Sequence, residues 1–71
     1  DPIFAAQQSV NQAMIAKNTA EIVASSPGGP TPNPQKVVDL TKENKTLAQQ
    51  NVDLQNAINN STYLSDKVKT I

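Results

Sequence analysis

Residues 25–34, which read Ser-Ser-Pro-Gly-Gly-Pro-Thr-Pro-Asn-Pro, divide this chain of 71 residues into two parts. They hold both glycines and four of the five prolines of the sequence, and neither a helix nor a central strand tolerates such a composition. The flanking segments, 1–24 and 35–71, contain only one further proline, Pro2. The sequence therefore predicts two elements joined by a linker or turn, forming one structural unit.

Both flanking segments begin with a helix start signal. Asp1-Pro2 and Asn33-Pro34 each place a good N-cap residue before a proline, which is favoured at the first helical position. Neither segment shows the alternation of a strand. We predict all-α structure, with helices over about 2–24 and 34–70 that are roughly 34 and 55 Å long. The linker allows an antiparallel hairpin, although a proline-rich spacer can also hold helices apart.

The first predicted helix carries apolar residues along two lines. Ile3, Val10 and Met14 form one stripe, flanked by three alanines, and Phe4, Ile15 and Ile22 form the other. Because a helix on a simple surface needs only one apolar stripe, two stripes indicate contact with more than one neighbour. The alternative is a single broad core face.

The second predicted helix carries heptads. Val37, Asn44, Asn51 and Ile58 fall at position a, and Leu40, Leu47 and Leu54 fall at position d. This pattern is typical of a coiled coil in which the asparagines fix register. It is equally typical of a helix packed on its own hairpin partner, with Asn44 and Asn51 near solvent. Leu64 and Val68 continue the spacing one residue out of phase, so we expect a bend, a repacking or a change of neighbour at residues 59–62.

The composition narrows the possible functions. There is no Cys, so a disulfide or a thiolate site is impossible, and no His, the commonest general base and zinc ligand. We therefore predict no enzyme, no catalytic residue, no cofactor, no metal and no small-molecule substrate. Six Lys balance six acidic residues, which argues against nucleic acid, and no apolar run reaches the roughly twenty residues that span a membrane.

Two short motifs resemble the terminal helices of bacterial flagellar axial proteins, the rod and hook family. They are Ala16-Lys17-Asn18-Thr19-Ala20-Glu21-Ile22 and Val38-Asp39-Leu40-Thr41-Lys42-Glu43. The Pro32-Asn33-Pro34 turn and the short length are similar to the needle subunits of type III secretion systems. Both families polymerise helically, so the resemblance implies an extracytoplasmic bacterial appendage.

A chain this small, without disulfide or metal, usually needs partners for stability. We therefore expect a structural subunit that associates with itself or enters a larger assembly. A discrete coiled-coil oligomerisation or adaptor module is an alternative, as is a phage or viral structural peptide. The mechanism we expect is burial of Ile3, Val10, Met14 and Ile15 against Leu40, Leu47, Leu54 and Ile58. The predicted interface residues are Ile3, Phe4, Val10, Met14, Ile15, Ile22, Val37, Leu40, Asn44, Leu47, Asn51, Leu54, Ile58, Leu64 and Val68.

Overall fold

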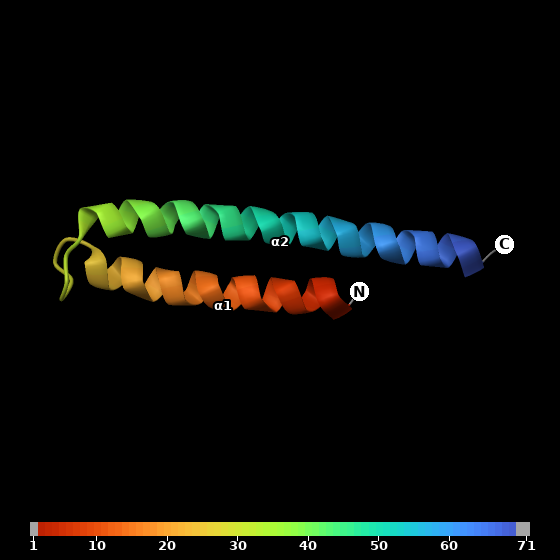
Figure 1. The fold of residues 1–71 in the computed structure, drawn as a ribbon, viewed down its shortest axis with the longest axis horizontal. Coiled ribbons are helices and arrows are strands. Elements are labelled where there is room, and N and C mark those ends of the chain that lie inside the picture. The colour runs from red at the N-terminus through yellow and green to blue at the C-terminus, as the bar shows by residue number, and fades with distance from the viewer. Residues whose placement is uncertain (1, 70–71) are drawn as a thin grey trace.

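The chain folds into an antiparallel pair of helices, as a computed structural model shows (Figure 1). The structure describes residues 2–69, and for residues 63–69 it describes the backbone only. Helix α1 spans Pro2–Ser25 and α2 spans Pro34–Lys69, with no strand among residues 2–69. The pair measures 61 × 15 × 13 Å. The predicted two-helix hairpin is confirmed, and the arrangement in which the linker holds the helices apart is wrong.

The turn between the helices is held by hydrogen bonds to the end of α1. The Thr31 N–H donates to the Ala24 carbonyl at 3.1 Å, and the Asn33 N–H donates to the Ser25 carbonyl at 2.8 Å. The Asn33 side chain then accepts a bond from the Lys36 N–H at 3.2 Å, which is the geometry of an N-cap. The turn therefore satisfies the last carbonyls of α1 and the first amides of α2 together.

Both glycines are needed for this turn. Gly28 has a φ of 86°, in the left-handed region that other residues seldom adopt. Gly29 lies against the end of α1, where an added Cβ would be 2.5 Å from the Ala24 carbonyl oxygen and 2.8 Å from that of Val23. The linker is thus a specific structure, and its glycines let the chain fold back closely onto α1.

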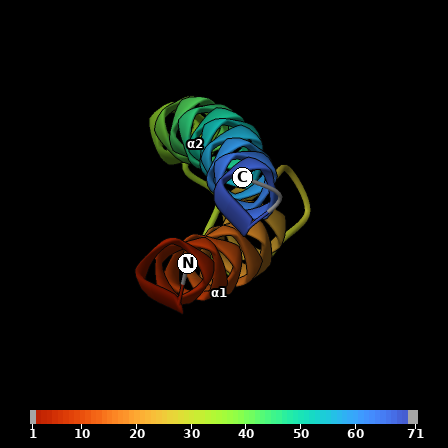
Figure 2. The ribbon, with the colours of Figure 1, turned by 90° about the vertical axis from the view of Figure 1, so that its right-hand side faces the viewer.

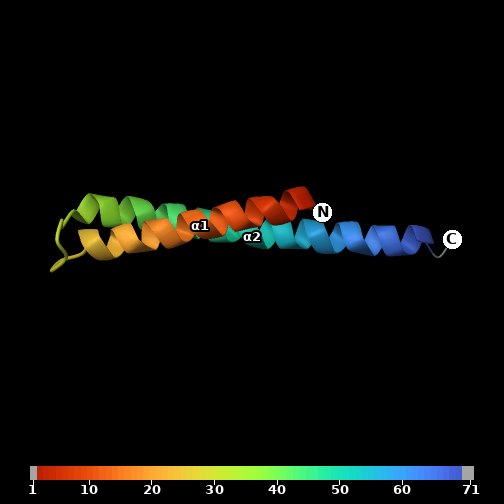
Figure 3. The ribbon, with the colours of Figure 1, turned by 90° about the horizontal axis from the view of Figure 1, so that it is seen from below.

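The helices lie side by side and cross at a shallow angle (Figures 2 and 3). Helix α2 is the longer one, with 36 residues against 24, and it continues past the N-terminal end of α1 (Figure 1). It runs through residues 59–62 without a break. Residues 59–62 lie at the level where α1 begins, and beyond this level no other helix of residues 2–69 lies beside α2 (Figure 1). The structure therefore shows neither a break nor a new neighbour there.

Candidate functional site: the interface between the helices and the outer face of α1

One hydrogen bond defines the register of the hairpin. Asn11 Nδ2 donates to Asn51 Oδ1 at 3.0 Å, so residues 11 and 51 lie at the same level. In an antiparallel pair, the residue number decreases along one helix as it increases along the other. This register therefore places Asn18 level with Asn44, and the bond from Asn44 Nδ2 to the neighbouring Thr19 Oγ1, at 3.3 Å, agrees with it.

The residues of α1 that face α2 follow the alternating spacing of four and three that is typical of a coiled coil. They are all buried or half-buried. We call this set the inner face of α1: Phe4, Gln8, Asn11, Ile15, Asn18, Ile22 and Ser25. The register alternates apolar and polar layers along the hairpin.

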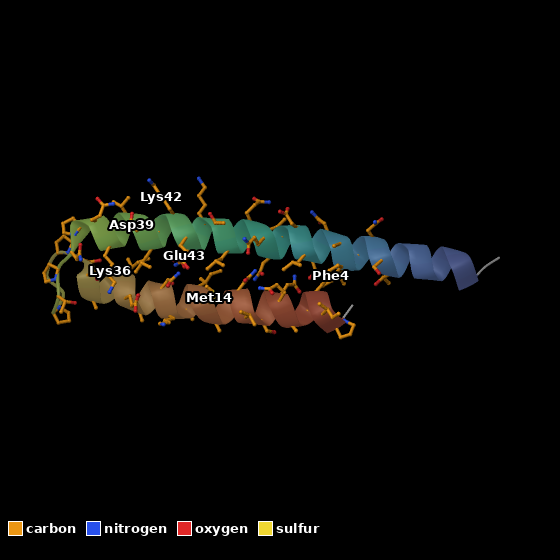
Figure 4. The ribbon with its side chains drawn as sticks, viewed as in Figure 1. Phe4, Met14, Lys36, Asp39, Lys42 and Glu43 are labelled. Atoms are coloured by element: carbon orange, nitrogen blue, oxygen red, sulfur yellow. The ribbon has the colours of Figure 1, made fainter. Side chains whose placement is uncertain are left out.

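The apolar layers join the isoleucines of α1 to the leucines of α2. Ile15 is level with Leu47, which is only 6% exposed, and Ile22 is level with Leu40. Phe4, at the open end, lies between the helices (Figure 4) and is half-buried. The leucine heptads of α2 therefore pack on α1 of the same chain.

The first polar layer is centred on Asn11, whose side chain is 1% exposed. Its Nδ2 also lies 3.3 Å from Gln50 Oε1, and its Oδ1 accepts a hydrogen bond from Gln7 Nε2 at 3.0 Å. Gln8 Nε2 donates to the Asn51 carbonyl at 3.1 Å, and Asn51 Nδ2 donates to the Gln8 carbonyl at 3.3 Å. Each helix is thus bonded to the backbone of the other, which fixes their alignment.

The second polar layer is less completely satisfied. Asn18 is 7% exposed, and its Nδ2 makes no hydrogen bond within the described part of the chain. The Oδ1 of Asn44, which the register places level with it, is likewise a buried acceptor without a bond. One of these two atoms is a donor and the other an acceptor, but this layer lacks the amide–amide bond that joins Asn11 to Asn51.

Several expectations about this interface need correction. Asn44 and Asn51 are half-buried and hydrogen-bonded to α1, so the hypothesis that placed them near solvent is wrong. Phe4, Ile15 and Ile22 are half-buried, so the stripe that they form faces α2 of the same chain. The remaining predicted residues of α2, Val37, Leu54 and Ile58, are half-buried as well. The side chains of Leu64 and Val68 lie outside the described residues.

The largest correction concerns the other stripe of α1. Ile3, Val10 and Met14 are 74%, 52% and 39% exposed, so their predicted pairing with the leucines of α2 is wrong within the hairpin. The heptad row that contains Ile3 and Val10 continues to Lys17. Turning this row toward α2 would leave Asn51 without its amide partner on α1, and an unsatisfied buried polar group costs free energy.

The polar members of the inner face were missed as interface residues. Asn11, Asn18 and Ser25 follow Phe4 at intervals of seven residues, and this interval was the signal that pointed to them. A search for apolar stripes passes over such positions, because hydropathy assigns asparagine to the surface.

The surface offers little that is typical of a catalytic or metal site. A shallow hollow between the helices is lined by Gln7, Gln50, Asp53 and Leu54. Among the described residues there is no group of three acidic side chains placed to hold a metal ion. Nor does the described part of either helix contain a stretch apolar and long enough to cross a membrane.

Comparison with protein-family models, with curated proteins and with solved structures finds no match to this chain. The case for a function therefore depends on the hairpin itself.

Proposed function

We propose that this chain is a non-enzymatic structural subunit that assembles with copies of itself into a larger helical structure. The observation that carries the proposal is the distribution of apolar residues. Leu47 is the only buried apolar side chain among the residues with described side chains, whereas Val10 and Met14 of α1 remain exposed.

The interior of the hairpin is better suited to alignment than to stability. Asn11, Asn18 and Ser25 are as buried as Leu47, and a hydrogen bond between buried polar groups contributes a net of only about 1 kcal/mol. Asparagine at a core position of a coiled coil fixes register at a cost in stability. A 71-residue chain with such a core gains the missing stability by burying further apolar surface against other subunits.

A filament of the flagellar rod, hook or secretion-needle kind is the form of assembly that the sequence motifs favour. A discrete coiled-coil module is the second candidate, and the paired asparagine layers favour it because such layers select one oligomeric state. The two differ in whether assembly stops at a fixed number of chains.

The test is sedimentation over a hundredfold range of concentration, with circular dichroism on the same samples. Species that keep growing with concentration support the filament. One small helical oligomer supports the discrete module. A chain that stays monomeric at every concentration contradicts self-assembly altogether.

A further inference from the structure

The exposed side of α1 carries a second heptad row, one residue out of step with the inner face. We define the outer face of α1 by the residues of this row together with the neighbouring Met14, all of which are exposed: Ile3, Ala6, Val10, Ala13, Met14, Lys17 and Ala20. Val10 and Met14 are 52% and 39% exposed, and alanines alternate with the larger side chains. Apart from Lys17, this face is apolar from Ile3 to Ala20, which is more than four helical turns.

The charge on α1 makes its outer face compatible with a copy of itself. Lys17 and Glu21 are the only ionisable side chains between Pro2 and Ser25. The chain as a whole has a formal net charge of zero, so two copies do not repel each other. A strongly charged partner would find only one charged side chain on the outer face, that of Lys17.

The exposed area of the hairpin fits an interface of ordinary size. The chain exposes 5180 Å², whereas a compact monomer of 7.6 kDa is expected to expose about 4300 Å². The excess of about 900 Å² belongs to the elongated hairpin as a whole, and it is similar in size to the roughly 800 Å² that each partner buries in a stable interface.

We propose that the outer face of α1 docks onto the outer face of α1 in a second copy, with the two helices antiparallel. The inference depends on the proposed function and adds the surface and the geometry of the contact. In a parallel pair Lys17 would lie beside Lys17 and Glu21 beside Glu21, whereas an antiparallel pair separates these like charges. A two-fold axis near residue 12 places Val10 of each copy against Met14 of the other. Each large side chain then has an alanine of the partner beside it, and the Lys17 ammonium reaches solvent at the rim.

The test compares two matched substitutions, Val10→Glu and Val52→Glu. Both valines are exposed to nearly the same extent, 52% and 53%, but Val52 lies on α2. Glutamate is the better helix former of the two residues, so neither change weakens its helix. We expect Val10→Glu to raise the dissociation constant for self-association at least about tenfold in sedimentation equilibrium. Val52→Glu should leave it within about threefold.

Single cysteines test the orientation, because the natural sequence has none. With the axis near residue 12, the two copies of residue 13 are offset by about 3 Å along the helix, and those of residue 20 by about 24 Å. Ala13→Cys should therefore give a disulfide-linked dimer under mild oxidation, while Ala20→Cys should not. Efficient linkage of Ala20→Cys without linkage of Ala13→Cys would overturn the antiparallel contact.

The outcomes separate the two proposals. If the natural chain associates and both glutamate variants associate equally well, the docking surface is wrong and the structural function stands. If the natural chain stays monomeric throughout, both are wrong. Weakening confined to Val10→Glu supports both.

Discussion

Replacement of Asn11 by alanine removes the most deeply buried polar side chain of the hairpin. Its carboxamide makes three hydrogen bonds, to Asn51, Gln50 and Gln7. Gln7 and Gln50 are exposed and can bond water instead, but Asn51 is half-buried and its Oδ1 loses its partner. The lost bond costs about 1 kcal/mol and the unsatisfied acceptor about 1–3 kcal/mol. The better helix propensity of alanine returns about 0.6 kcal/mol, leaving a net loss of about 2 kcal/mol.

The assay is thermal unfolding followed by circular dichroism at one fixed protein concentration, since self-association shifts the midpoint. For a domain of this size about 2 kcal/mol corresponds to a fall in Tm of roughly 8–16 °C. Asn56→Ala is the control, because Asn56 is exposed on α2 and only the gain in helix propensity, about 0.6 kcal/mol, is expected there. Combining Asn11→Ala with Asn51→Ala should cost less than the sum of the single changes. Equal stability of the Asn11→Ala and Asn56→Ala chains would refute the importance of the amide pair.

Two further predictions concern the turn and the apolar layers. Gly29→Ala should destabilise the hairpin by about 2–3 kcal/mol in the same unfolding assay, because the new Cβ would clash with the Ala24 carbonyl oxygen. Gly28→Ala should cost only about 1–2 kcal/mol. Its Cβ would meet nothing within 4 Å, and the cost comes from the positive φ alone. Leu47→Asp places a carboxylate at a position that is 6% exposed. Helix content, measured by circular dichroism, and assembly, measured by sedimentation, should therefore be lost together. Assembly like that of the natural chain would contradict the packing of the leucines.

The sequence was sufficient to predict the helices and the turn, because their signals are local. Asn33 and Pro34 mark the start of α2 by chemistry that acts within one helical turn, and the heptads of α2 correctly placed Leu47 toward a partner helix. The face that α1 presents was not predictable in the same way, because α1 has apolar residues on both sides. Which side of α1 faces α2 depends on the α2 residues opposite it. The deciding partner of Asn11 is Asn51, which is 40 residues away in the sequence, so no local pattern in α1 reveals it.

The inner and outer faces of α1 have different roles in the proposed assembly. The inner face provides the alignment, since both amide layers match in only one register. A slip by one heptad would place Asn11 opposite Ile58 in one direction, and Asn51 opposite Phe4 in the other. The outer face has no layer of paired amides. It offers apolar area for a contact, but it does not fix the alignment of the two helices that meet there. A contact between two outer faces is isologous and closes into a dimer, so it cannot by itself extend a filament. Growth requires a second, different contact, and the part of α2 that continues past α1 is the segment of the hairpin that its own partner helix does not cover (Figure 1). In a filament built from this chain, the outer face of α1 would therefore close each dimer, and a second contact elsewhere on the hairpin would join one dimer to the next.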